Sequence, residues 1–150
     1  MAHALAVQIR RLPHAAGLDL PAYQTAGAAG MDLHAAVEDE ITVDAGAIVL
    51  VPTGLQIAVP DGFEAQVRPR SGLAVKHGIS LPNTPATIDS DYRGEIRVPL
   101  INLGREAFRV SRGMRIAQFV VAPVVRVAWD EVQSLPTTDR GRQGFGHSGT

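Results

Sequence analysis

The densest group of residues able to do chemistry is the run Ile88-Asp89-Ser90-Asp91-Tyr92-Arg93-Gly94-Glu95. In an extended segment Asp89 and Asp91 share one face, because side chains repeat every two residues. One carboxylate could then act as a general base while the other is held by a structural partner. A solvated hairpin turn that ends at Gly94 accounts for the same spacing, so the run by itself is compatible with either interpretation.

A second polar group, Arg68-Pro69-Arg70-Ser71-Gly72, comes just before a stretch with helical character at residues 71–77. The start of a helix offers unpaired N–H groups to an anion, and arginine adds bidentate contacts to phosphate. An ordinary helix whose N-cap is Ser71 is the alternative. The group therefore indicates an anion site only if other segments support it.

Three further segments carry polar residues in unusual settings. Asp32 lies in an apolar run just after a glycine, where a simple turn is the plainer interpretation, and Gln118 is a polar residue in an otherwise apolar strand. The run 140–149 combines glycine, arginine and hydroxyl groups, which suits wrapping around phosphates. Its one aromatic residue, Phe145, suits stacking on a base.

Several common catalytic motifs are missing from the sequence. It contains no G-x-x-x-x-G-K-[ST] phosphate loop, no H-E-x-x-H metal motif and no G-x-S-x-G nucleophile elbow. It also has no cysteine, which excludes disulfides and thiolate metal sites. Any phosphate chemistry must therefore use another scaffold.

The length and charge of the chain limit its class. Its 150 residues suit one domain, and its net charge of -1 creates no field that would favour nucleic acid or membranes. No apolar run approaches the ~20 residues that cross a bilayer, and the first ten residues lack the apolar core of a signal peptide. We therefore expect a cytoplasmic protein that binds neither nucleic acid nor membrane.

Short strands must position the polar groups. The 15 glycines and 10 prolines are spread along the chain, and proline breaks helix interiors. Apolar and polar residues alternate, as in half-buried strands, at 55–59, 63–67 and 96–100, while 47–51 and 119–121 are predicted to be fully buried strands. Turn residues separate them at 44–46, 60–62, 103–104 and 112–113. This pattern predicts an all-β sandwich or barrel, such as a jelly roll, with one short helix at 71–77.

The last residues differ in kind from the rest. Residues 137–150 contain four glycines and two arginines and show no apolar periodicity. We expect a β domain at 1–136 followed by a mobile arm at 137–150, although composition alone fits a plain disordered tail.

In this order and at these separations, the five polar segments resemble the five motifs of the trimeric dUTPase family. The resemblance runs from about Gly27 to Ser148, and its most specific parts are the run 88–94 and Gly144-Phe145-Gly146. It implies a β jelly roll and a homotrimer whose active sites lie at subunit interfaces, each closed by a C-terminal arm. It also implies Mg²⁺-dependent hydrolysis of dUTP to dUMP and pyrophosphate, which keeps uracil out of DNA and supplies dUMP for thymidylate synthesis.

The resemblance assigns roles to individual residues. Asp89 matches the catalytic carboxylate that activates the attacking water, and Asp32 matches an aspartate that holds the metal through water. In the β domain, the residues that match phosphate-binding positions are Arg70, Ser71, Gly72 and Gln118. Those in the arm are Arg140, Gly146, His147 and Ser148.

The remaining matches concern the nucleoside. Asn83, Thr87 and Ile88 match a hairpin whose backbone pairs with the uracil edge, and Phe145 matches an aromatic that stacks on uracil. Tyr92 matches the aromatic that packs under deoxyribose and leaves no room for a 2′-hydroxyl. Arg97 matches a further position on the substrate side.

Two alternatives remain open at this stage. A relative of dCTP deaminase would share the jelly roll, but the glycine-aromatic tail argues against it. A non-catalytic nucleotide-binding regulator would share the fold, but the intact Asp89 argues against it. Ala86 departs from the family pattern, which has glycine there. If that position needs a positive φ, alanine costs about 1 kcal/mol, and we expect it to be tolerated with a small loss of rate.

Overall fold

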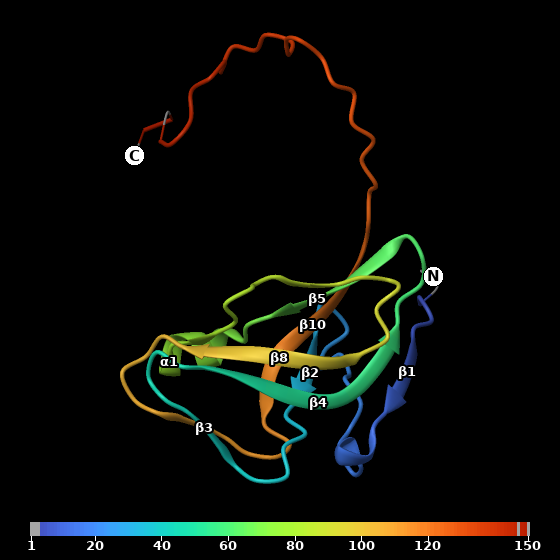
Figure 1. The fold of residues 1–150 in the computed structure, drawn as a ribbon, viewed down its shortest axis with the longest axis vertical. Helices are drawn as coiled ribbons and strands as arrows, with labels where there is room; N and C mark the ends of the chain where they lie inside the picture. Colours follow the sequence, from blue (N-terminus) through green and yellow to red (C-terminus); the bar gives the residue numbers. More distant parts are fainter. Residues whose placement is uncertain (1–3, 147, 150) are drawn as a thin grey trace.

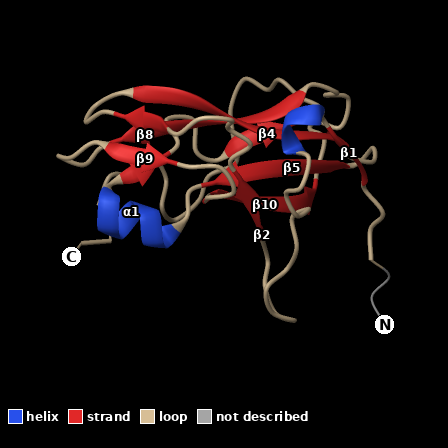
Figure 2. Cartoon of the chain, turned by 90° about the horizontal axis from the view of Figure 1, so that it is seen from below, coloured by secondary structure: helices blue, strands red, loops and turns tan. Residues whose placement is uncertain are grey.

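Two antiparallel sheets packed face to face form the body of the molecule (Figures 1 and 2). A computed structural model describes residues 4–146, 148 and 149. The first sheet has the order β1-β4-β8-β6, with strands Gln8–Arg11, Ile48–Ala58, Glu95–Asn102 and Ile79–Ser80. The second has the order β2-β10-β5-β7, with strands Met31–His34, Arg115–Pro123, Phe63–Arg68 and Ala86–Ile88. A two-stranded ribbon, β3 (Ile41–Val43) with β9 (Phe108–Val110), flanks them.

The core lies between the two sheets and follows from alternation along the strands. On β5, Ala65 and Val67 point inward and are buried, and on β8 the inward residues are Ile96, Val98 and Leu100. The helix α1 spans Ser71–His77, as expected, and a 3-10 turn η1 spans Pro13–Ala15. The predicted all-β fold with a short helix is therefore confirmed.

One burial prediction was wrong. Residues 47–51 were expected to form a fully buried strand, yet β4 begins at Ile48 and alternates, with Ile48 58% exposed, Leu50 52% exposed and Val51 buried. At residues 119–121 only Phe119 is fully buried. Both strands have one face on the core and an apolar face turned outward, so a run of apolar residues does not imply burial on both sides.

A bulge in β4 positions the N-terminal turn. The β4–β8 register shifts between Pro52 and Gln56, and Gly54 adopts a φ of 65° inside the shift. A side chain at Gly54 would collide with Ala15 of η1, so only glycine allows the turn to dock on the strand. Bulges remove a residue from the regular ladder and often lie beside functional sites. Here the bulge frees the N–H of Gly54 for a side-chain partner.

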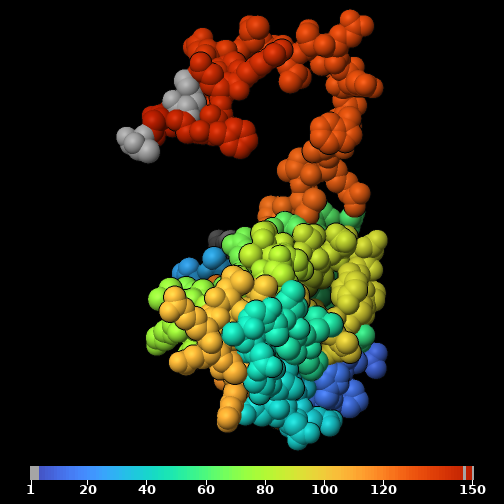
Figure 3. Space-filling model, turned by 60° about the vertical axis from the view of Figure 1, so that its left-hand side comes forward, coloured from blue at the N-terminus to red at the C-terminus, as the bar shows by residue number. Residues whose placement is uncertain are grey.

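The chain leaves the sheets after Pro123 (Figure 1). Every described residue from Val124 onward is exposed, including Trp129 at 91% and Phe145 at 111%. Figure 3 shows this segment standing off the body as an extended loop. Among the described residues, no helix is long and apolar enough to cross a membrane.

Candidate active site

A pocket of about 180 Å³ lies between β7, the loop after it and the start of β8. Its wall includes six residues that the sequence predicted for the site: Asn83, Thr87, Ile88, Asp89, Tyr92 and Arg97. Asp89 is exposed, so its carboxylate is open to a ligand in the pocket. The structure thus gathers the predicted base and the predicted nucleoside-contacting residues, except Phe145, in one place.

Pairing between β7 and β5 sets the position of Asp89. Thr87 lies opposite Gln66, and Ile88 lies opposite Ala65 and is buried against the core. The strand ends there, so Asp89 projects from a residue that is fixed by packing. The N–H of Tyr92 then donates to the carbonyl of Asp89 at 3.1 Å and closes the following turn.

The ring of Tyr92 folds back over this turn. Its hydroxyl donates to the carbonyl of Glu95 at 2.9 Å, and any side chain at Gly94 would collide with the ring. The glycine that sequence analysis took as a turn terminator therefore also makes room for an aromatic wall. Tyr92 is 44% exposed, which leaves part of the ring open to a ligand.

The alanine at position 86 causes no backbone strain. Ala86 is the first residue of β7 and pairs with Val67. Among the described residues, Phe145 (φ 50°) is the one non-glycine residue with a positive φ. Ala86 therefore does not adopt the positive φ at which alanine would be unfavourable.

A second polar cluster centres on Asp32, whose residue is only 8% exposed. Arg70 donates from Nε to its Oδ1 at 3.0 Å, and Nη1 of Arg115 lies 3.6 Å from its Oδ2. On the sheet, Gln118 lies opposite Asp32 on one side and Arg68 on the other. Three predicted site residues, Asp32, Arg70 and Gln118, therefore lie at one end of this sheet.

The first turn of α1 adjoins this cluster. Arg70, and not Ser71, occupies the N-cap position, and no side chain caps the helix. Ser71 and Gly72 are exposed, and a Cβ at Gly72 would meet nothing within 4 Å. The cluster thus combines two arginines, a hydroxyl and open backbone, which are suitable donors for a phosphate group.

The donor set fits a metal ion only in part. In the part of the chain that the structure describes, no three His, Asp or Glu residues are placed to hold a metal. Each oxygen of Asp32 faces an arginine. Mg²⁺ commonly takes one or two carboxylates and completes its shell with phosphate oxygens and water. The residues therefore suit a Mg²⁺ ion carried largely by a ligand, and water-mediated contact with Asp32 stays a prediction.

The pocket and the Asp32 cluster lie far apart in one chain. Ile88 pairs with Ala65, so Asp89 lies near Glu64, whereas Arg70 comes after the opposite end of the same strand. Six residues of extended chain between Glu64 and Arg70 span ~20 Å. A single chain therefore does not place the predicted base beside the predicted phosphate arginine.

The third group of predicted residues lies in the C-terminal segment. Arg140 donates to the carbonyl of Gln143 at 2.9 Å, inside the segment itself. Phe145, Gly146 and Ser148 are exposed, and none of them lines the pocket. Figure 3 shows the described part of this segment standing off the body. The predicted residue His147 lies outside the described residues.

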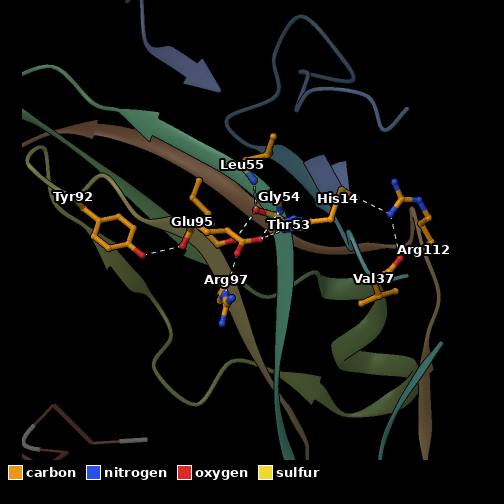
Figure 4. A network of polar contacts seen from close by, with 10 residues as sticks. His14, Val37, Thr53, Gly54, Leu55, Tyr92, Glu95, Arg97 and Arg112 are labelled. Atoms are coloured by element: carbon orange, nitrogen blue, oxygen red, sulfur yellow. Dashed lines mark hydrogen bonds and ion pairs between the residues drawn. The ribbon is translucent and has the colours of Figure 1, made fainter. Parts of the chain in front are cut away.

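Sequence analysis missed Glu95, which also lines the pocket. Its carboxylate is 11% exposed and has three partners (Figure 4). Oε1 lies 2.6 Å from Nε2 of His14 and accepts the N–H of Gly54 at 2.9 Å, and Oε2 accepts from Nε of Arg97 at 3.1 Å. Burial by itself raises the pKa of Glu95, but the bonds with His14, Gly54 and Arg97 outweigh it and lower the pKa.

Part of this network was accessible from sequence. Glu95 and Arg97 are two residues apart in a strand, so they share a face. His14 is 81 residues away from Glu95, and its contact depends on the docking of η1. No local pattern could have found it.

Comparison with known proteins found clear matches over nearly the whole chain. A family model described as dUTPase matches residues 16–149. The deoxyuridine 5'-triphosphate nucleotidohydrolase of Rhizobium meliloti (strain 1021) is 61% identical over 142 residues, covering 93% of this chain and 89% of that protein. The dUTPase of Staphylococcus bacteriophage 80alpha, solved with dUPNHPP, superposes with a TM-score of 0.87 at 20% identity, covering 98% of this chain and 100% of the other. A mutant dUTPase from phage phi11 of S. aureus, whose structure describes the coordination of a structural Mg(II) ion, gives a TM-score of 0.77 at 17% identity, covering 87% of this chain and 98% of the other.

Proposed function

This chain belongs to the dUTPase family and hydrolyses dUTP to dUMP and pyrophosphate, and we propose that Asp89 is the carboxylate that carries the reaction. The observation that carries this proposal is the position of Asp89 in the wall of the pocket, beside β7 and Tyr92. The family match and the name of the relative favour hydrolysis over the deaminase alternative.

Asp89 holds and deprotonates the attacking water. The water oxygen forms a bond to the α-phosphorus, its proton passes to the Asp89 carboxylate, and the bond from the α-phosphorus to the bridging oxygen of pyrophosphate breaks. Phosphoryl transfer depends mainly on positioning and on neutralisation of charge. A fixed carboxylate at the end of a packed strand meets the first requirement.

The segment 83–88, which comprises β7 and the turn before it, selects the base. Its backbone N–H and C=O groups near Asn83, Thr87 and Ile88 pair with the uracil edge. Cytosine presents exchanged donors and acceptors, and a buried polar group without a partner costs about 1–3 kcal/mol. The ring of Tyr92 packs under deoxyribose and excludes a 2′-hydroxyl, and Arg97 contacts the nucleotide from the β8 side.

Phosphate groups are bound by residues of other copies of the chain. Arg70, Ser71, Gly72 and Gln118 lie toward the opposite end of β5 from Asp89, and Arg70 is ~20 Å away when measured along the strand. A homotrimer with active sites at its interfaces brings the pocket of one subunit to the Asp32 cluster of the next. Subunit interfaces would also offer a place to bury Ile48 and Leu50, which are exposed in the single chain.

The arm at 137–150 closes the site of a neighbouring subunit, beyond the body domain at 1–136. Its extension away from the body supports this role (Figure 3). Phe145 stacks on uracil, and the phosphate contacts come from Arg140, Gly146, His147 and Ser148.

Magnesium is the proposed cofactor. When bound, it neutralises charge on the phosphate oxygens and helps to orient the triphosphate. Asp32 would hold it through water, and its 3.0 Å bond also keeps Arg70 in place. We also place the enzyme in the cytoplasm, where nucleotide pools for DNA synthesis are maintained.

Pyrophosphate release from dUTP with Mg²⁺ tests the assignment of Asp89. The substitution Asp89→Asn keeps the shape of the side chain and removes its charge. It should lower kcat by at least about a hundredfold, as expected for loss of a general base, while nucleotide binding persists. Unchanged turnover would refute the role of Asp89.

A further inference from the structure

We propose that Glu95 is a positioning residue of the active site, which holds the Arg97 guanidinium against the nucleotide pocket. This inference rests on the proposed function, because the ligand it serves is dUTP in that pocket. It gives a role to a half-buried carboxylate that has no part in the proposed hydrolysis.

Partners other than Arg97 also hold the carboxylate of Glu95 in place. Oε1 accepts the N–H that the β4 bulge frees at Gly54 and contacts His14 of η1, so partners from two other elements hold it (Figure 4). The carbonyl of Ile96, the next residue, accepts the Thr53 hydroxyl at 2.6 Å, which ties β8 to the same bulge. Glu95 is therefore anchored in both its side chain and its strand.

The N-terminal turn that presents His14 is fixed as well. Arg112 donates from Nη1 to the carbonyls of His14 and Val37, at 2.8 and 3.2 Å, and from Nη2 to the carbonyl of Ala16 at 2.8 Å. These bonds hold η1 on the body independently of any ligand. The support for Glu95 is thus part of the rigid fold.

Arg97 depends on this support because its side chain is otherwise open. It is 56% exposed, and it meets Oε2 of Glu95 through Nε. The bond through Nε leaves both terminal nitrogens of the guanidinium for another partner. Since Arg97 lines the pocket, those nitrogens can donate to sugar or phosphate oxygens of the nucleotide.

A positioning role of Glu95 and a purely electrostatic effect of its charge predict opposite changes of KM in the Glu95→Gln variant. Loss of a negative charge near an anionic substrate would by itself strengthen binding and lower KM. Loss of the charge-assisted bond to Arg97 would let the guanidinium move and raise KM. The amide oxygen of glutamine can still accept from Gly54, so the support from the bulge is largely kept.

A double-mutant cycle on dUTP hydrolysis tests the proposal. Glu95→Gln should raise KM about three- to tenfold, in line with a charge-assisted hydrogen bond, with kcat within a factor of about two. In an Arg97→Met background the same substitution should not raise KM, because only the effect of the lost negative charge remains. Glu40→Gln is the matched control, because Glu40 also pairs with an exposed arginine, Arg109, but lies near the β3–β9 ribbon.

Several outcomes would overturn the proposal. These are a lower or unchanged KM in Glu95→Gln, or an equal rise of KM in both backgrounds. If Glu95→Gln does not fold, Arg97→Lys tests the proposal instead. Lysine keeps the positive charge but lacks the Nε donor that binds Glu95 and the planar guanidinium. A KM equal to that of wild type for Arg97→Lys would then contradict positioning, and a raised KM would support it. Failure of the wild-type chain to release pyrophosphate would instead refute the proposed function itself.

Discussion

Two inactive variants of this chain should restore each other's activity when their subunits mix. Asp89→Asn removes the proposed base, and Arg70→Gln removes an arginine from the Asp32 cluster. Within one chain the two positions are ~20 Å apart along β5. One triphosphate therefore meets both residues only if they come from different subunits.

The size of the recovery follows from the geometry. In a homotrimer each site takes Asp89 from one subunit and Arg70 from its neighbour. After random mixing at equal amounts, the first subunit has an intact Asp89 in half of the cases, and its neighbour has an intact Arg70 in half. About a quarter of the sites should then be complete, so activity should rise from near zero to about a quarter of the wild-type value.

The assay is pyrophosphate release after the two variants are unfolded and refolded together, with sedimentation to confirm the assembly. A mixture of wild type with the double variant Asp89→Asn/Arg70→Gln is the control. Its activity should fall from about half to about a quarter on subunit exchange, because complete sites now need two adjacent wild-type chains. No gain in the first mixture, together with a steady half in the control, would show that each chain builds its own site.

Three further results are expected. Deletion of residues 140–150 should leave the assembly intact by sedimentation and greatly reduce turnover, since the described part of the arm lies off the body; monomers would show instead that the arm is structural. Tyr92→Ala should weaken discrimination of dUTP against UTP, measured as the ratio of the two kcat/KM values, and a wild-type ratio would count against the sugar wall. The lowered pKa of Glu95 means that its ionised form stabilises the fold above the pKa of the unfolded chain, and that this contribution is lost as pH falls through the folded value. Glu95→Gln should therefore lower Tm at pH 7 but by less below pH ~4, and a gap that stays constant in thermal denaturation would contradict this.

Local periodicity was enough to predict much of the fold. The two-residue alternation at 63–67 and 96–100 corresponds to β5 and the inward face of β8, and the helix at 71–77 has the predicted bounds. Periodicity could not tell which apolar faces are covered, and for this reason the outward Ile48 and Leu50 were misjudged. Whether such a face is covered depends on what packs against it, which is a property of the assembly and not of the strand.

The candidate site likewise has a part that could be predicted from the sequence and a part that could not. The run 83–97 could be predicted as one unit because its residues are close in sequence and line one pocket. The expected hairpin was wrong, since β7 and β8 pair in different sheets. The contacts of Glu95 with His14 and of Asp32 with Arg70 join residues 81 and 38 positions apart. They depend on a bulge and on the sheet order, neither of which leaves a periodic trace in the sequence.

The separation of the functional residues within one chain supports the proposed homotrimer. The second sheet holds the Asp32 cluster near one end of β5 and carries Asp89 at the other end, and fixed placement is what phosphoryl transfer requires. Rigidity also means that no hinge within the described body can close the ~20 Å between Asp89 and Arg70. In the proposed homotrimer, symmetry would overcome this separation, because an interface that brings Asp89 of one subunit to Arg70 of the next does so for every subunit. The part of the site that must admit substrate and release product is then left to the extended arm, whose described residues make their hydrogen bonds locally and can dock without disturbing either sheet.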